Sequence, residues 1–337
     1  MRLRAKAPLR VSFAGGGTDV APFPETEGGC VLSATIARYV YGSLTPRADG
    51  TIAVESPDLG VSQEFSVGHE HHLEGSLDLV RGAIRRLGVM EREGYDLFLN
   101  SSAPPGSGLG SSSAVMVTLV GLLKERYGLP YDDYELARLA WEIERQDLNI
   151  RGGLQDHYAA TFGGFNFIEF HADHVVVNPL RVPAHTIDEL EHNLLLCFTG
   201  RTRASDHVID DQTERVVRGE DEALEGLRAQ KVLAEAMKRA LLLGRVDEFG
   251  ELLGDAWEQK KRLSTRITTP YIDEAYAAAR AAGALGGKVT GAGGGGYLLL
   301  YCEFQRRHHV QEALEKLDMA VDEVAFSSRG VTTWRTR

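Results

Sequence analysis

The chain has 337 residues, 43% of them hydrophobic and 25% charged, and this length favours two domains over one. Its formal charge of −11 argues against nonspecific nucleic-acid binding, and no apolar run approaches the ~18 residues of a membrane span. Cys30, Cys197 and Cys302 form no CxxC pair and the N-terminus lacks an apolar signal region, so we expect reduced thiols in a cytoplasmic protein.

The first half of the chain is predicted to be rich in strands. Val, Phe, Ile and Tyr between glycine breaks indicate strands. A run that is apolar on nearly all faces and ends in Lys124, Arg126 and Gly128 indicates one helix, and apolar residues at helical spacing indicate a second. The strands are expected at 9–14, 31–44, 95–104 and 162–170, and the helices at 114–128 and 131–148.

The second half is predicted to be richer in helix. Residues 180–192 have no strong period and are expected to form a linker. Two or three helices are expected within 206–262, another at 271–283, and a strand pair around a glycine turn at 287–304. We therefore predict an α+β fold in two domains, residues 1–185 and 186–337.

The segment PPGSGLGSSSA (residues 104–114) places three alternating glycines and three serines directly before a predicted helix. Glycine lets ligand atoms approach the main chain, and a helix start carries unpaired N–H groups and partial positive charge, so the segment predicts a phosphate cradle. The alternative is a plain turn with a serine N-cap. The spacing matches neither the P-loop, because no lysine follows, nor the dinucleotide fingerprint, whose third glycine comes one residue later.

Two further glycine clusters, APLRVSFAGGGTD (7–19) and KVTGAGGGG (288–296), suggest one phosphate site lined by several segments. Phosphoryl transfer also needs a carboxylate that accepts the acceptor's proton. Asp156, in the glycine-flanked segment GGLQDHYAATFGG (152–164), is the candidate base, although a helix-capping role is equally compatible with the local sequence.

With these segments, the chain resembles the GHMP kinases, the family that includes galactokinase, homoserine kinase and mevalonate kinase; the three glycine motifs match in order over about residues 7–300. Within the family, the GGGTD, IERQDLNIRGGLQDHYAATFGGFNF and TGRTRAS strings are similar to heptose 7-phosphate 1-kinases, and parts of them to fucokinases. Gly16 and Gly17 stand where galactokinase has Glu-His, which makes galactose an unfavourable acceptor.

The resemblance implies a ribosomal-protein-S5-like N-terminal half, a ferredoxin-like C-terminal half and ATP bound between them. It implies Asp156 as the base, Arg10 as the cation beside the transferred phosphate, and Ser112 with Glu144 as Mg²⁺ ligands, with Glu142 not excluded. The ATP-binding residues would be Pro105, Gly106, Ser107, Gly108, Leu109, Gly110, Ser111, Ser112 and Ser113. The sugar would contact Gly16, Gly17, Thr18, Asp19, Gly153 and Gly293, with Arg201, Arg203 and Lys288 as candidate cations for its own phosphate.

The expected activity is therefore ATP-dependent phosphorylation of the anomeric hydroxyl of a heptose 7-phosphate. The alternatives are a fucokinase-like enzyme, a silent sensor that binds nucleotide and sugar without transfer, and a nucleotide-dependent oxidoreductase suggested by the glycines alone. The expected partners are ATP and a sugar phosphate, with no nucleic acid and no membrane, and a homodimer is left open.

Overall fold

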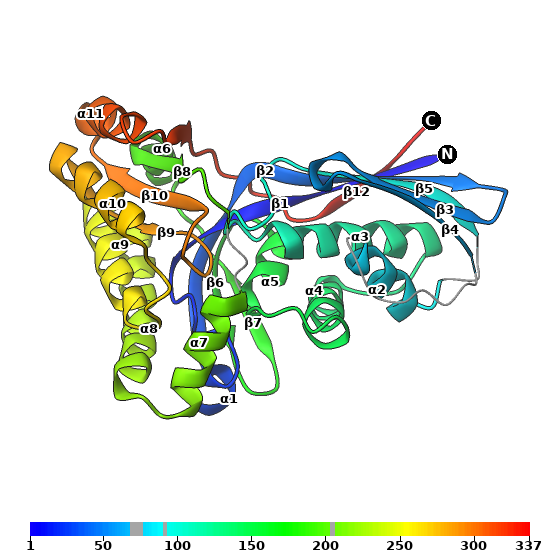
Figure 1. Cartoon of the computed structure of the whole chain (residues 1–337), viewed down its shortest axis with the longest axis horizontal. Helices are drawn as coiled ribbons and strands as arrows, with labels where there is room; N and C mark the ends of the chain where they lie inside the picture. The colour runs from blue at the N-terminus through cyan, green and yellow to red at the C-terminus, as the bar shows by residue number, and fades with distance from the viewer. Residues whose placement is uncertain (68–76, 90–92, 203–205) are drawn as a thin grey trace.

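The computed structural model describes residues 1–67, 77–89, 93–202 and 206–337. The chain forms two sheets with helices packed on them, as the α+β prediction required (Figure 1). Among the described helices, none combines the length and apolar character that a bilayer crossing requires.

The larger sheet has eight strands in the order β12-β1-β2-β5-β3-β4, with β6 and β7 joined to it through β2. The strands are β1 (Arg2–Ala14), β2 (Gly29–Arg47), β3 (Thr51–Ser56), β4 (Val61–Ser66), β5 (Gly94–Ser101), β6 (Phe165–Phe170), β7 (Val175–Pro179) and β12 (Thr332–Thr336). Strand β2 is long enough to pair with β5 along its second half and with β6 along its first half. It therefore ties the strands before and after the helices into one sheet.

The helices of the first half lie on one face of this sheet (Figure 1). They are α2 (Asp78–Arg86), α3 (Ser111–Tyr127), α4 (Asp133–Trp141) and α5 (Gln155–Phe162), with the short α1 (Phe23–Glu27) and the turn η1 (Pro57–Leu59) elsewhere. Helix α3 contacts β1 and β2 on one side and α4 and α5 on the other. This explains why α3 is apolar on nearly every face, since a helix covered all round needs no polar stripe.

The helix expected at 131–148 is an α-helix over its first half and a π-helix over its second. After α4 the chain continues as a π-helical segment, η2 (Glu142–Asp147), in which Ile143 and Glu144 are buried. A π-helical turn shifts the helical phase, and such turns are frequent at functional sites. Here the shift brings a carboxylate into the protein interior.

The smaller sheet has four strands in the order β11-β8-β10-β9. Its strands are β8 (Leu194–Phe198), β9 (Ala284–Val289), β10 (Tyr297–Cys302) and β11 (Ala320–Glu323), and the helices of this half are α6 (Ala184–Asn193), α7 (Asp206–Val217), α8 (Asp221–Leu242), α9 (Val246–Lys261), α10 (Pro270–Ala282) and α11 (Phe304–Glu315). Helix α9 packs on β9, and α8 packs on α9 and on strands β1 and β2 of the larger sheet. These contacts bring the C-terminal end of α9 and the β9–β10 turn close to strand β1.

The linker prediction for 180–192 is wrong over most of its length. Helix α6 begins at Ala184, and its residues Thr186 and Leu190 are buried. One buried leucine in a ten-residue helix gives little periodicity, and α6 is instead stabilised by packing against α9 and α11. The domain boundary between residues 185 and 186 stays a prediction; strand β12, which lies beyond it, pairs with β1 of the larger sheet.

Candidate active site

One pocket of about 260 Å³ is lined by segments far apart in the sequence. They are β1 and the glycine turn after it, the N-terminal end of α3, the stretch from η2 to the start of α5, α7, the end of α9 and the β9–β10 turn. The three glycine clusters thus meet at a single cavity, the arrangement that their distribution along the chain suggested.

Arg10 and Asp156 form a partly buried ion pair at this pocket. Arg10 lies on β1 with 4% of its side chain exposed, and Asp156 lies in the first turn of α5. Arg10 Nε donates to Asp156 Oδ1 at 2.7 Å, Nη2 lies 2.6 Å from the same oxygen, and Nη1 donates to the Gly108 carbonyl at 2.6 Å. Arg10 therefore joins the candidate base to the glycine-rich segment, and no partner of Asp156 Oδ2 is found among the described residues.

The glycine segment before α3 adopts the left-handed conformations that only glycine takes readily. Gly106, Gly108 and Gly110 have φ angles of 72°, 78° and 74°. Gly110 is the N-cap of α3 and supplies no side-chain cap, so the first-turn amides of α3 are available to a ligand. A Cβ on Gly110 would lie 3.3 Å from Asp156 Cγ, so this backbone also borders the candidate base. An anion bound at this helix end would lie next to Asp156.

Glu144 is fully buried and is surrounded by hydrogen-bond donors. Its Oε1 accepts from Ser112 Oγ at 2.5 Å, and its Oε2 accepts from Ser113 Oγ at 2.8 Å and lies 2.6 Å from His157 Nε2. Burial alone would raise the pKa of Glu144, but Arg145, His157 and Ser112 outweigh burial and lower this pKa to about 2. The carboxylate is therefore ionised at neutral pH.

Ser112 and Glu144 provide the kind of donor set that Mg²⁺ takes. Mg²⁺ prefers oxygen ligands and is commonly held by one or two protein groups together with waters and phosphate oxygens. A hydroxyl and an ionised carboxylate meet here beside a helix N-terminus. The alternative ligand Glu142 instead pairs with Arg86 and Arg138. No cluster of three or more His, Cys, Asp or Glu side chains suited to a metal occurs among the described residues, and a site of the Ser112–Glu144 kind would not contain one.

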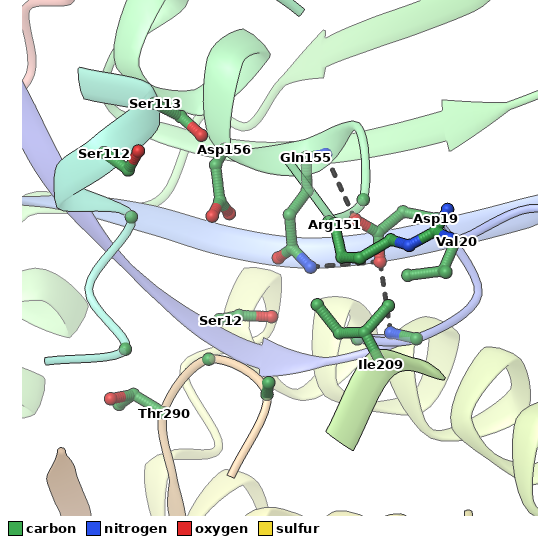
Figure 2. A pocket seen from close by; sticks show the side chains of 18 of the residues that line it. Ser12, Asp19, Val20, Ser112, Ser113, Arg151, Gln155, Asp156, Ile209 and Thr290 are labelled. Atoms are coloured by element: carbon green, nitrogen blue, oxygen red, sulfur yellow. Dashed lines mark hydrogen bonds between the residues drawn. The ribbon is translucent and has the colours of Figure 1, made fainter. Parts of the chain in front are cut away.

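Asp19 is buried. Asp19 and Asp156 lie on opposite sides of Gln155 (Figure 2). Its carboxylate accepts hydrogen bonds at 3.1 Å from the Gly17 amide, the Gln155 amide and Gln155 Nε2. Burial and the nearby Asp156 raise the pKa of Asp19, while these hydrogen bonds lower it in part. A Cβ on Gly153 would overlap Asp19 Oδ2, so Gly153 is required for this close approach.

The third glycine cluster packs directly on the second. A Cβ on Gly291 would lie 2.5 Å from the Cα of Gly108, and the Tyr297 amide donates to the Ser107 carbonyl at 3.1 Å. Several of these glycines therefore allow two backbone segments to touch, in addition to any contact with a ligand. Gly293 lies in the same turn and lines the pocket.

Most of the residues predicted from sequence line this pocket. They are Arg10, Gly16, Gly17, Asp19, Gly106, Gly108, Gly110, Ser111, Ser112, Ser113, Glu144, Gly153, Asp156 and Gly293. Pro105, Ser107 and Leu109 belong to the same segment but are not among the lining residues. Thr18 is buried; its hydroxyl lies within hydrogen-bond distance of the Gly15 and Cys30 carbonyls and accepts from the Cys30 amide, so Thr18 holds the turn together, and it is not among the lining residues.

Of the three predicted phosphate-binding cations, the two that the structure describes do not line the pocket. Lys288 is buried on β9 and donates one hydrogen bond to the Phe13 carbonyl at 3.0 Å, and burial lowers the pKa of Lys288 well below its usual value. Arg201 lies outside the lining, with its guanidinium 5.6 Å from the centre of the Tyr271 ring. Arg203 lies outside the described residues.

Several lining residues were missed from sequence: Ser12, Arg145, Arg151, Gln155, Lys260 and Thr290. Ser12 was recoverable, because residues two apart on a strand share a face and Arg10 was already a candidate. Gln155 precedes the candidate base. Lys260 has no local signal: it ends a helix in a segment rich in charged residues, and only tertiary packing brings its ammonium to the Gly291 carbonyl.

Comparisons with known proteins agree with this geometry. Residues 78–164 match the model of the GHMP kinases N terminal domain, and residues 233–319 match that of the GHMP kinases C terminal domain. The chain is 36% identical to the D-glycero-alpha-D-manno-heptose 7-phosphate kinase of Campylobacter jejuni over 99% of both chains. It is 28% identical to the bifunctional fucokinase/GDP-fucose pyrophosphorylase of Arabidopsis thaliana over 94% of this chain and 31% of that protein.

Solved structures show the same likeness. The crystal structure of a D-glycero-D-manno-heptose 1-phosphate kinase from Bacteroides thetaiotaomicron superposes with a TM-score of 0.84 at 36% identity, covering 99% of each chain. Lactococcus lactis galactokinase complexed with galactose has a TM-score of 0.79 at 21% identity, covering 98% of this chain and 95% of that one, which shows the shared fold alone. The chain therefore belongs to the GHMP kinase family, and its sugar-kinase relatives are ATP-dependent phosphotransferases with a hydroxyl group as acceptor.

Proposed function

We propose that this protein transfers the γ-phosphate of ATP to the anomeric hydroxyl of D-glycero-D-manno-heptose 7-phosphate. The product would be the 1,7-bisphosphate, used for nucleotide-activated heptose in surface polysaccharide synthesis. The observation that carries the proposal is the meeting of Asp156, Arg10 and the uncapped N-terminus of α3 in one pocket. The sugar is inferred from the motif resemblance and from the 36% identical heptose 7-phosphate kinase.

The roles of the charged residues follow from their positions. Asp156 accepts the proton of the acceptor hydroxyl through Oδ2, because Arg10 already occupies Oδ1. The bond from the sugar oxygen to the γ-phosphorus forms as the bond from that phosphorus to the leaving ADP oxygen breaks. Arg10 offsets negative charge on the transferred group, and the first-turn amides of α3 hold phosphate oxygens.

Ser112 and Glu144 would hold the Mg²⁺ that accompanies ATP. When bound, the ion supplies neutralisation of phosphate charge. Asp19, fixed by Gln155 and Gly17, would accept hydrogen bonds from sugar hydroxyls. Gly16 and Gly17 line the pocket with Asp19 at the positions where galactokinase has Glu-His, which supports an acceptor other than galactose.

The test is an ADP-release assay with MgATP and heptose 7-phosphate, followed by phosphorus NMR to locate the new phosphate on C1. Heptose 1-phosphate, L-fucose and galactose serve as comparison acceptors, because the named relatives point to different sugars. Faster turnover of heptose 7-phosphate than of the other acceptors is expected. Absence of ADP release with every sugar would overturn the proposal and favour a silent sensor, provided that calorimetry still detects nucleotide and sugar binding.

A further inference from the structure

We propose that Arg151 binds the phosphate group that the acceptor already carries, and that it thereby makes the enzyme select a phosphorylated sugar. This inference rests on the proposed function and deepens it by assigning the residue that reads the acceptor's charge. Arg151 lies in the loop between η2 and α5, and it lines the same pocket as Asp156.

The position of Arg151 suits the end of the acceptor remote from the transfer. Figure 2 shows Ser112, Ser113 and Asp156 on one side of the pocket and Arg151, with Val20 and Ile209, on the other. Gln155 lies between the two groups in that view, and Asp19 is drawn on the same side as Arg151. An acceptor with its anomeric hydroxyl at Asp156 would extend past Gln155 toward the side that holds Asp19 and Arg151, so the far carbon of a seven-carbon sugar would approach the guanidinium.

Two side chains that line the pocket, Ser12 and Gln155, carry buried polar atoms suited to a hydroxylated ligand. Ser12 is 4% exposed and Gln155 is 9% exposed, and both line the pocket. Ser12 Oγ and Gln155 Oε1 are buried atoms without a hydrogen-bond partner among the described residues. An unpaired buried polar atom is costly, so these two atoms are best explained by groups that a sugar supplies. They place the sugar ring between Asp156 and Arg151.

Arg151 is also the pocket cation that is most available to a ligand. Four cationic side chains of the described residues line the pocket: Arg10, Arg145, Arg151 and Lys260. Arg10 is paired with Asp156, Arg145 lies against Glu144 and Ser113, and Lys260 donates to the Gly291 carbonyl. Arg151 instead pairs with Asp210 of α7 at 3.0 Å. The Arg151 side chain is 56% exposed and the Asp210 side chain is 50% exposed.

An exposed ion pair of this kind is weak, so a phosphate can replace Asp210 as the partner of Arg151. A dianionic phosphate also offers the guanidinium a bidentate, charge-assisted contact that a solvated carboxylate provides less well. Asp210 would then hold the arginine near the pocket until the acceptor binds.

The backbone at Arg151 is held in position by hydrogen bonds from Arg145. Arg145 Nη1 donates to the carbonyls of Ile150 and Arg151 at 3.4 and 3.3 Å. A Cβ on Gly152 would overlap the Arg145 guanidinium, so glycine permits this contact. Arg145 therefore connects the buried carboxylate Glu144 with the loop that presents Arg151.

The experiment compares Arg151→Gln, Arg151→Lys and the matched control Arg201→Gln, each assayed with heptose 7-phosphate and with the unphosphorylated heptose. For Arg151→Gln we expect kcat/KM for heptose 7-phosphate to fall by roughly 10- to 100-fold, mainly through KM, as for the loss of a charge-assisted contact. The value for free heptose should stay unchanged. Arg151→Lys should recover part of the loss, and Arg201→Gln should match the wild type with both sugars because Arg201 does not line the pocket.

A second variant tests the exchange of partners. Asp210→Asn removes the competing carboxylate, so KM for heptose 7-phosphate should fall by up to about 5-fold, the range for an exposed ion pair. KM for free heptose should not change. A rise in KM for heptose 7-phosphate alone would contradict the exchange.

The outcomes separate this inference from the proposed function. Turnover of both heptoses with equal kcat/KM, or an equal loss for both in Arg151→Gln, overturns the role of Arg151 and leaves the kinase activity standing. No turnover of any sugar overturns the proposed function. In that case calorimetric binding of heptose 7-phosphate to wild type and Arg151→Gln decides the inference, and equal affinity refutes it.

Discussion

Replacing Lys260 with methionine should stabilise the folded protein and impair transfer. Lys260 lies at the end of α9 with 5% of its surface exposed, and its ammonium donates to the Gly291 carbonyl in the turn that packs on Gly108. It lines the pocket near Arg10, Asp19 and Asp156. The residue therefore keeps a charge inside the protein beside the position proposed for the transferred phosphate.

The magnitude follows from the pKa of Lys260. Burial, followed by the charge of Arg10, lowers this pKa from 10.5 to about 8, although Asp19 and Asp156 act to raise it. Such a shift corresponds to about 3 kcal/mol of unfavourable free energy for the charged form in the folded state. Removing the side chain also forfeits a hydrogen bond to Gly291 that contributes about 1–2 kcal/mol. Lys260→Met should therefore stabilise the protein by about 1–2 kcal/mol at pH 7.

The pH dependence has a definite sign. The folded pKa lies below the unfolded one, so between about pH 8 and 10.5 the unfolded chain binds more protons than the folded chain at this residue. The unfolding free energy of the wild type should therefore rise with pH across that window, because the penalty for the buried charge of Lys260 is removed. Lys260→Met lacks this rise, so its advantage at pH 7 should shrink as the pH rises and then reverse, because the variant still lacks the hydrogen bond to Gly291.

The assay is urea unfolding of wild type and variant at a series of pH values from 7 to 10, alongside initial rates of ADP release. Lys261→Met is the matched control, because Lys261 is a neighbouring lysine on the same helix that pairs with Glu258 at the surface. It should change stability by less than about 1 kcal/mol. A Lys260→Met variant that is destabilised at pH 7, or whose difference from wild type is constant with pH, would refute the reasoning.

Three further predictions test the site. Asp156→Ala should lower kcat by roughly 10²- to 10⁴-fold and leave ATP affinity by calorimetry near normal; a change confined to ATP affinity would argue against a base. Glu144→Gln should raise the Mg²⁺ concentration for half-maximal rate. Because the folded pKa of Glu144 is lowered to about 2, its ionic stabilisation is complete above pH 4.5 and is lost on acidification toward pH 2, so acid unfolding curves should show a pH-dependent loss that Glu144→Gln lacks. Gly153→Ala, whose Cβ would overlap Asp19 Oδ2, should raise the sugar KM with ATP affinity retained; unchanged sugar kinetics would contradict the placement of Asp19.

The sequence alone was sufficient for features that depend on neighbouring residues. The glycines at 106, 108 and 110 predicted a backbone that approaches a ligand at a helix start, and they take left-handed conformations before α3. A long apolar run ending in basic residues and Gly128 located α3, β-forming residues between glycine breaks located the strands around it, and the three ordered motifs indicated the family that the comparisons confirm. These signals are local, since backbone conformation and side-chain periodicity are written within a few residues.

The tertiary structure decided which distant residues share the site. The guanidinium of Arg10 reaches Asp156 across 146 positions, and the ammonium of Lys260 reaches Gly291 across 31. Lys288, an equally plausible cation by sequence, instead donates to the Phe13 carbonyl near the end of β1. Helix α6 and strand β12 likewise depend on partners elsewhere in the chain. A long-range contact has no fixed spacing in the sequence. Residue type can therefore suggest a lysine or an arginine as a candidate site residue, but only the packing of the sheets and helices determines where its charge lies.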